Sequence, residues 1–378
     1  MTSNAGEGVD VVCLGESMVT FVPSRPGRLA DVPTFARTIG GAESNVACAL
    51  AAAGHRAKWV GRVGTDGFGD HLVEAIAAYG VDTSAVARDP LRPTGVYFRT
   101  ATDRATDAHE VVYYRAGSAA SAMSPETVGW EAVGGGRVLH VSGITAALSE
   151  DCLALVRTVT APREGRPLVS FDVNFRAGLW RDGRGPEVLM DLARGADVVF
   201  VGEDEAEEAW GVVGADAIRE ALPEPSVVVV KRGGEGAVAF ARCAASFPTP
   251  ADAPADAPAD APAPDTRTAV LAPAVHVVAP VGAGDAFAAG FLSATLRGLG
   301  VKERLRHGHL MAAAALTVPG DLGAPPTRRP ATTPHGAASP RTSWIAHADR
   351  LVALSDDAWG RLRLGPGWTG DDQEVRTP

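Results

Sequence analysis

Short runs of β-branched residues alternate along this chain with alanine-rich stretches of helical pattern, and this alternation constrains the fold most. It is typical of a mostly parallel sheet whose crossover helices cover both faces. The sequence therefore predicts a doubly wound α/β fold. The predicted strands are Val9 to Leu14, Ala57 to Gly61, Arg137 to Val141, Leu168 to Asp172, Asp197 to Val201 and Val227 to Lys231.

Helical segments are predicted between these strands, among them Ser44 to Ala53 and Asp66 to Tyr79. Ser44 or Asn45 is expected to cap the first of the two, because short polar side chains accept hydrogen bonds from the open amides of a first turn.

One region breaks the alternation. Residues 94–101 and 110–115 are strand-like and are joined by the polar segment 102–109, a pattern that predicts a β-hairpin. A hairpin inserted into an α/β core is a candidate lid over the carboxyl edge of the sheet.

Composition excludes several classes of function. The 378 residues are 46% hydrophobic and 21% charged, which suits a globular protein with a full α/β core. A net charge of −10 and only three lysines argue against a nucleic-acid surface. The N-terminus lacks the basic start and apolar stretch of a secretory signal, and no long apolar segment follows, so we expect a cytoplasmic protein without a membrane partner.

Two regions have a biased composition. Residues 250–264 repeat Pro-Ala-Asp-Ala and predict a solvated loop insertion, placed at about 246–268, because such a sequence buries too little apolar surface to order itself. Residues 326–378 are rich in proline, arginine, threonine and glycine, and we expect a poorly structured tail. The alternative is a short docked helix formed by Ile345 to Leu354 with Trp344, Trp359 and Trp368.

The strongest local signal is a strand, a glycine turn and a helix over Val277 to Gly290. The turn Gly282-Ala283-Gly284 leaves the first amides of the helix open, and these amides and the helix dipole form an anion site suited to a transferring phosphoryl group. Asp285 stands in the first turn, where it can act as a base. Taken alone, the motif fits a capped helix behind a turn about equally well.

A second glycine turn precedes another helix. Gly40 and Gly41 allow a ligand to approach the backbone closely, while Asn45 offers a donor and an acceptor to sugar hydroxyls. The alternative is a loop followed by a helix cap.

These two turns resemble the motifs of the ribokinase-like (PfkB) carbohydrate kinase family, over about residues 9–325. The resemblance implies a doubly wound, mostly parallel sheet with helices on both faces and a small β-sheet lid. It implies a kinase domain of residues 1–325 with lid segments near 16–40 and 92–118, and it allows a homo-oligomer formed through the lid. Within the family, the 2-keto-3-deoxygluconate kinases are most similar in four strings: Gly40 to Glu43, Tyr113 to Ala119, Ser142 to Thr145 and Asp172 to Trp180.

An acidic sugar requires cations among hydroxyl-binding groups, and Arg115 and Arg176 provide them, since a guanidinium can bind a carboxylate at two points. Tyr97 and Tyr113 can pack on the carbon chain, although without the resemblance they fit a cross-strand aromatic pair and Arg115 a solvated lid residue. The expected substrate contacts are Gly40, Gly41, Asn45, Tyr97, Tyr113, Arg115, Asn174, Arg176 and Asp285.

The resemblance also implies nucleotide contacts. Glu205 matches a family glutamate that acts on magnesium through water, so no residue is expected to ligate a metal directly, and acid at a helix start is the alternative. His309 falls where relatives place a residue beside the purine, and a solvated helix histidine is the alternative. The expected nucleotide contacts are Glu205, Lys231, Gly233, Gly234, Gly236, Gly282, Gly284 and His309.

The expected reaction is the transfer of phosphate from ATP, with Mg²⁺, to the terminal hydroxyl of 2-keto-3-deoxygluconate. Asp285 would accept the proton, while the amides of the Gly282-Ala283-Gly284 turn stabilise the developing charge. One alternative is another kinase of the family, acting on fructose, ribose or a nucleoside. The other is a non-catalytic sugar-binding regulator, favoured by Gly202 and Ala279, which replace polar family residues.

Overall fold

The computed structural model describes residues 8–25, 27–100, 110–242, 265–322 and 340–369. Its main sheet has eight strands in the order β14-β13-β12-β11-β10-β9-β1-β4. Six strands are parallel, and β13 and β14 add an antiparallel edge. The bounds are β1(Val9–Leu14), β4(Ala57–Val60), β9(Gly136–Ser142), β10(Leu168–Asp172), β11(Val198–Gly202), β12(Val227–Lys231), β13(Ala237–Arg242) and β14(Asp265–Val270).

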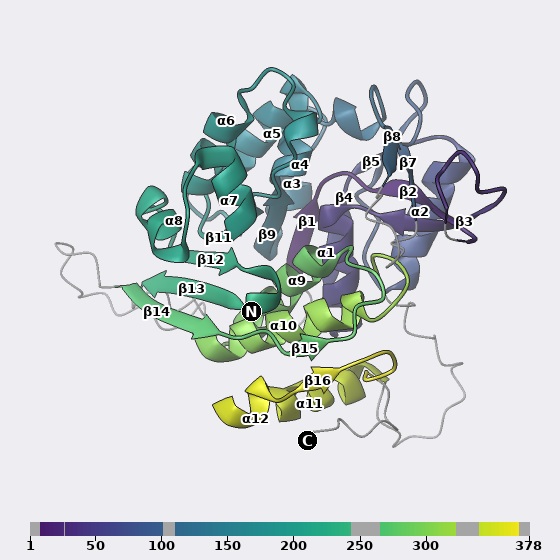
Figure 1. The fold of residues 1–378 in the computed structure, drawn as a ribbon. Coiled ribbons are helices and arrows are strands. Elements are labelled where there is room, and N and C mark those ends of the chain that lie inside the picture. Colours follow the sequence, from purple (N-terminus) through teal and green to yellow (C-terminus); the bar gives the residue numbers. More distant parts are fainter. Residues whose placement is uncertain (1–7, 26, 101–109, 243–264, 323–339, 370–378) are drawn as a thin grey trace, which may run out of the picture.

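Helices cover both faces of this sheet (Figure 1). Successive residues of a strand point to opposite faces, so Val198 and Phe200 join one buried cluster while Val199 and Val201 join the other. The first cluster includes residues of α1(Ala42–Ala52), α2(Gly67–Ala78), α9(Ala283–Leu296) and α10(Val301–Leu316); the second includes residues of α5(Glu150–Thr160), α6(Gly185–Arg194), α7(Glu203–Trp210) and α8(Ala215–Ala221). The predicted doubly wound α/β fold is confirmed.

The lid is a separate four-stranded sheet in the order β3-β2-β7-β8. The predicted hairpin is confirmed, because β7 and β8 pair antiparallel with Tyr97 opposite Tyr113. Its connection, residues 101–109, lies outside the described residues. The strands are β2(Met18–Pro23), β3(Phe35–Gly40), β7(Val96–Arg99) and β8(Val111–Tyr114).

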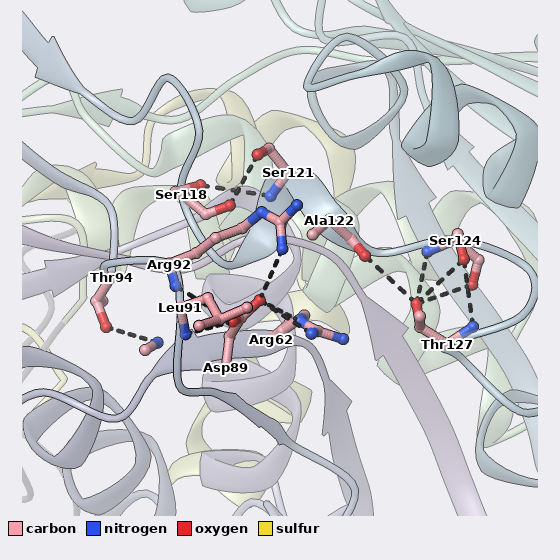
Figure 2. A network of polar contacts seen from close by, with 11 residues as sticks. Arg62, Asp89, Leu91, Arg92, Thr94, Ser118, Ser121, Ala122, Ser124 and Thr127 are labelled. Carbon is pink, nitrogen blue, oxygen red and sulfur yellow. Dashed lines mark hydrogen bonds and ion pairs between the residues drawn. The ribbon is translucent and has the colours of Figure 1, made fainter.

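A polar network anchors the base of the lid (Figure 2). The short strands β5(Arg62–Gly64) and β6(Ala87–Asp89) pair there, and the carboxylate of Asp89 is 1% exposed. It forms ion pairs of 2.9 Å with Arg62 and 3.4 Å with Arg92, and it accepts the amide of Leu91 at 2.9 Å. The segment that leads into β7 is therefore held on the body of the molecule.

Short elements complete the described part: η1(Ala120–Ala122), α3(Trp130–Val133), α4(Gly143–Ala146), η2(Ala177–Leu179), η3(Gly233–Glu235) and β15(Ala274–Val275). In the described ranges, none of the helices combines the length and the apolar character needed to cross a bilayer.

The C-terminal region corrects one expectation. Instead of a poorly structured tail, residues 340–369 form α11(Pro340–Val352), α12(Asp356–Gly360) and β16(Arg363–Leu364), which pairs with β15. These elements lie beside α10 (Figure 1). Trp359 and Trp368 are 2% and 4% exposed, and indole Nε1 of Trp359 donates to the carbonyl of Leu271 at 2.8 Å. The alternative of a docked helix is the one the structure adopts, because apolar burial outweighs the polar composition around it.

Two local expectations also change. Helix α1 begins at Ala42 after Gly41 and has no side-chain cap, so neither Ser44 nor Asn45 caps it. Residues 243–264, which contain most of the Pro-Ala-Asp insertion, lie outside the described residues. The insertion predicted at 246–268 reaches too far, since β14 begins at Asp265.

Candidate active site

A cavity of about 520 Å³ lies at the carboxyl ends of the parallel strands, between the lid and the starts of α1 and α9. This is the edge where open α/β sheets bind ligands. All nine predicted substrate contacts line it. The lining includes Gly40, Gly41, Asn45, Tyr97, Tyr113, Arg115, Asn174, Arg176, Glu205, Lys231, Gly282, Ala283, Gly284 and Asp285.

The turn before α9 requires glycine. Gly282 has a φ of +74°, and a Cβ there would lie 2.4 Å from the carbonyl oxygen of Asp321. Helix α9 begins at Ala283, and its first amides have no partners within the helix. Because Ala283 and Gly284 line the cavity, these amides form a site for a negatively charged group.

Asp285 lies in the first turn of α9 and accepts a hydrogen bond of 2.8 Å from Asn45 on α1. Burial raises the pKa of Asp285 to about 7, helped by the charges of Asp172 and Asp321. The hydrogen bond from Asn45 and the charge of Lys231 act in the opposite direction. The carboxyl group can therefore take up and release a proton near neutral pH.

Lys231, at the end of β12, is held by Asp172, at the end of β10. Its Nζ lies 2.9 Å and 3.0 Å from the two carboxylate oxygens. Burial alone would lower the pKa of Lys231, but the charges of Asp172 and Glu205 raise it. Lys231 therefore stays positively charged at the edge of the cavity.

The glycine turn after Lys231 is confirmed as a backbone feature, and its nucleotide role stays a prediction. Gly233 and Gly236 have positive φ, and a Cβ on Gly236 would lie 2.2 Å from the carbonyl oxygen of Val270. Gly233, Gly234 and Gly236 are not among the residues that line the described cavity.

Arg115 and Arg176 both have carboxylate partners. Arg115, on the loop after β8, forms an ion pair with Glu16, whose carboxylate also accepts from Ser118 at 3.0 Å. Burial raises the pKa of Glu16, although Arg115 and Ser118 oppose this. Arg176 is 56% exposed and lies 3.3 Å from Glu205. A carboxylate ligand would therefore compete with Glu16 for Arg115 and with Glu205 for Arg176.

Tyr97 and Tyr113 form the cross-strand pair that was the alternative to ligand contact, with ring centroids 5.4 Å apart. Both also line the cavity. The hydroxyl of Tyr97 is occupied, because it donates to Asp321 at 3.2 Å, whereas the Tyr113 side chain is 50% exposed. The structure therefore favours Tyr113 over Tyr97 as a ligand contact.

Asn174 has a φ of +42° and is 7% exposed. Its Oδ1 is buried without a hydrogen-bond partner in the described part of the chain, and the residue lines the cavity. Because buried polar atoms are normally hydrogen-bonded, this oxygen is suited to accept a hydrogen bond from a ligand hydroxyl.

Glu205 lines the cavity and also binds the start of a helix, which was the alternative to a nucleotide contact. One carboxylate oxygen accepts the amide of Gly202 at 3.0 Å at the start of α7. The other oxygen pairs with Arg176.

The structure contradicts the alternative interpretation of His309, a solvated histidine. It is 6% exposed in α10, its Nε2 lies 3.3 Å from the carbonyl oxygen of Val270, and its ring meets that of Phe287 edge to face. Burial lowers its pKa to about 4. His309 is therefore not a solvated histidine, because its side of α10 packs on α9 and β14. It does not line the described cavity, and its contact with the purine stays a prediction.

Four charged residues of the cavity were not predicted: Glu16, Arg99, Asp172 and Asp321. Asp321 binds Tyr97 and lies 3.3 Å from Arg99, so it links the lid to the loop after α10. Glu16 follows the predicted strand Val9 to Leu14, and Asp172 ends the predicted strand Leu168 to Asp172. Their position at the carboxyl edge of the sheet could have identified them as site residues. Asp321 carried no such signal, since its loop follows a helix.

Comparisons with known proteins identify the relatives of this chain. The family model described as "pfkB family carbohydrate kinase" matches residues 9–328. A 2-dehydro-3-deoxygluconokinase of Bacillus subtilis is 33% identical over 325 residues, which cover 85% of this chain and 93% of the relative. Fructokinase-1 of rice, Oryza sativa subsp. japonica, is 31% identical over 294 residues, which cover 76% and 83%.

Solved structures show the same fold. A PfkB protein from Polaromonas sp. JS666 superimposes with a TM-score of 0.68 at 34% identity, covering 81% of this chain and 95% of that one. A 2-dehydro-3-deoxygluconokinase of Thermotoga maritima superimposes with a TM-score of 0.65 at 26% identity, covering 84% and 95%. The family model spans most of the sequence, so this chain belongs to the pfkB family of carbohydrate kinases.

Proposed function

We propose that this carbohydrate kinase transfers the γ-phosphoryl group of ATP to the terminal (6-) hydroxyl of 2-keto-3-deoxygluconate or a related sugar acid. The observation that carries the proposal is the cavity itself. It holds a carboxylate with a near-neutral pKa, Asp285, beside the open amides of α9, and it places Arg115 and Arg176 among hydroxyl-binding groups.

In this reaction Asp285 accepts the proton of the sugar hydroxyl while the hydroxyl oxygen forms a bond to the γ-phosphorus. The bond from that phosphorus to the bridging oxygen breaks, and ADP leaves. The amides of Ala283 and Gly284 stabilise the negative charge on the transferring group. Asn45 holds the Asp285 carboxylate in place through its hydrogen bond of 2.8 Å.

Magnesium, when bound with the nucleotide, would neutralise phosphate charge. In the ranges that the structure describes, no group of three His, Cys, Asp or Glu converges on one point. Glu205, which lines the cavity, supplies an oxygen that suits a water-mediated contact to such a hard cation.

A sugar acid is favoured by Arg176 in particular, because its guanidinium is 56% exposed and its link to Glu205 is loose at 3.3 Å. The relatives are compatible with an acidic and with a neutral sugar, since a 2-dehydro-3-deoxygluconokinase and a fructokinase are both similar to this chain. Fructokinase activity is the second candidate. It is favoured by Glu16, which neutralises Arg115 in the absence of any ligand.

A coupled assay of ADP release over a panel of sugar acids and neutral sugars tests the proposal. We expect 2-keto-3-deoxygluconate to give the highest kcat/KM, and we expect Arg176→Ala to reduce the preference for it over an uncharged analogue. Higher kcat/KM for fructose would establish the second candidate. No phosphorylation of any sugar would favour a non-catalytic sugar-binding protein.

A further inference from the structure

Lys231 projects toward the turn that begins α9. A Cβ built on Gly284 would lie 3.6 Å from Nζ of Lys231, so the ammonium group stands directly beside the open amides of that turn. Lys231 is 17% exposed at its side chain and lines the cavity. Its charge is therefore available to a ligand in the cavity and is poorly screened by water.

The cavity-lining arginines are positioned differently. Arg99 pairs with Asp321, Arg115 with Glu16 and Arg176 with Glu205, and the first two pairs are buried. Their carboxylate partners hold them on the lid side or at α7, whereas Asp172 holds Lys231 beside the α9 turn. Lys231 is the lysine that lines the cavity, and the two others in the sequence, Lys58 and Lys302, pair with Asp82 and Asp356 elsewhere.

The contact between Lys231 and Asp172 leaves bonding capacity for a ligand. A lysine ammonium has three donors, and two of them are directed at the two oxygens of Asp172, at 2.9 Å and 3.0 Å. One donor remains. Asp172 is 3% exposed, so it fixes the ammonium in one position before a ligand arrives.

We propose that Lys231 is a catalytic residue that binds the transferring phosphoryl group, and that Asp172 is a positioning residue that holds the Lys231 ammonium beside the α9 turn. This inference rests on the proposed kinase function and adds a cation to its mechanism. The phosphoryl oxygens gain negative character away from water, and a fixed ammonium stabilises them without further reorganisation.

The same pair acts on the base. The groups that face Asp285 are Asn45 from α1, Asp172 from β10, Lys231 from β12 and Asp321 from the loop after α10. Asp172 raises the pKa of Asp285 and Lys231 lowers it. Removal of the Asp172 charge should therefore lower the pKa of Asp285, and removal of the Lys231 charge should raise it.

The first test is nucleotide binding, which needs no sugar. Isothermal titration in the presence of Mg²⁺ compares ADP with a non-hydrolysable ATP analogue in the unmodified protein, Lys231→Met and the control Lys58→Met. Lys58 is 20% exposed and pairs with Asp82 away from the cavity. We expect Lys231→Met to weaken the analogue about tenfold or more and ADP by less than about threefold, because a single charged hydrogen bond to the γ-phosphate is lost. Lys58→Met should match the unmodified protein. Equal weakening of both nucleotides by Lys231→Met would overturn the proposal.

The second test is kinetic. Removal of one hydrogen-bond donor to a developing charge lowers kcat by about 10² to 10³. We expect a loss of this size for Lys231→Met and a smaller loss of kcat for Lys231→Arg, which keeps the positive charge. The acid limb of the kcat profile should move to higher pH in Lys231→Met and to lower pH in Asp172→Asn. Movement in the same direction, or none, would overturn the role of Asp172.

Lys231→Met leaves Asp172 buried without its partner, which can destabilise the fold. If the melting temperature of this variant falls sharply, the double variant Lys231→Met/Asp172→Asn replaces it. The double variant removes the unpaired charge and should still lose the preference for the γ-phosphate. If the binding results hold but no sugar is phosphorylated, the proposed function and the catalytic role of Lys231 both fail, and only the contact of Lys231 with the γ-phosphate stands.

Discussion

Nδ2 of Asn45 donates a hydrogen bond of 2.8 Å to Oδ2 of Asp285, although 240 residues separate them in the sequence. The bond joins the first turn of α1 to the first turn of α9. It ties the glycine turn before α1 to the turn before α9. The proposed base and anion site are thereby linked to the predicted sugar contacts.

Replacement of the base should separate binding from turnover. We expect Asp285→Asn to lower kcat by roughly 10² to 10⁴, the usual range for loss of a general base, and to leave ATP binding largely unchanged. Asparagine keeps the shape of the side chain and an acceptor for Asn45. Steady-state kinetics and nucleotide titration provide the measurement, and near-normal turnover would contradict the mechanism.

The pH dependence of kcat should report the same group. Only the ionised form of Asp285 accepts a proton, and its pKa is raised to about 7, chiefly by burial. We therefore expect kcat to rise as pH increases from about 6 to 8 and to level off above that range. A rate that is flat between pH 5 and 8 would show that another group acts as the base.

The titration of Asp285 should also affect the stability of the fold. A rise in pH, which increases kcat, should lower this stability. The folded pKa of about 7 lies above the ordinary value of 3.8, so the folded protein binds this proton more tightly than the unfolded chain. Stability is then lost as pH rises from about 4 to 7. Asp285→Asn cannot ionise, so it should melt higher than the unmodified protein at pH 8, and the gap should close toward pH 4. A gap that is constant with pH would contradict this.

Glu16 should reduce the preference for acidic sugars. In Glu16→Gln the amide keeps an acceptor for Ser118 while the negative charge beside Arg115 is removed. We expect the ratio of kcat/KM for 2-keto-3-deoxygluconate to that for an uncharged analogue to rise about tenfold, which corresponds to ~1.4 kcal/mol. Glu110→Gln is the matched control on the lid, since Glu110 binds the amide of Leu29 and does not line the cavity. A reduced ratio in Glu16→Gln would mean that its charge is needed to position Arg115.

The C-terminal segment should contribute to stability. Trp359 is 2% exposed, donates to Leu271 and stacks under Arg306, whose Cζ lies 4.7 Å from the ring centroid. We expect Trp359→Ala to lower the free energy of unfolding by about 3 to 5 kcal/mol, the cost of emptying a buried aromatic site. Urea denaturation measures this, with Leu91→Ala as the control because Leu91 is 86% exposed. A change as small as that of the control would show that the segment is not coupled to the core.

Much of the site was predictable from local sequence. A glycine turn before a helix specifies its own geometry, because glycine adopts the positive φ of Gly282 at little cost and the helix amides open there. The location of Asp285 in the first turn was therefore correct. The strand predicted from Val277 before this turn is wrong, since residues 276–281 form no strand. The predicted strand β10 has the bounds Leu168–Asp172 that the structure shows, and it is a short, mostly apolar run that begins directly after Pro167.

The pairing of charges required the tertiary structure. Arg115 was predicted to bind the carboxylate of a substrate, and in the structure Glu16, from a distant loop, pairs with it. His309, for which a solvated position was the alternative, is buried beside Phe287. Both outcomes depend on which residues a crossover brings together and which side of a helix is buried.

The sequence by itself determined the doubly wound fold, the lid hairpin and the anion turn, since each follows from periodicity and backbone conformation within a few residues. Only the tertiary structure decided the partners of Arg115, Lys231 and Asp285 and the docking of residues 340–369, because ion pairs and apolar contacts between distant segments depend on distance in space.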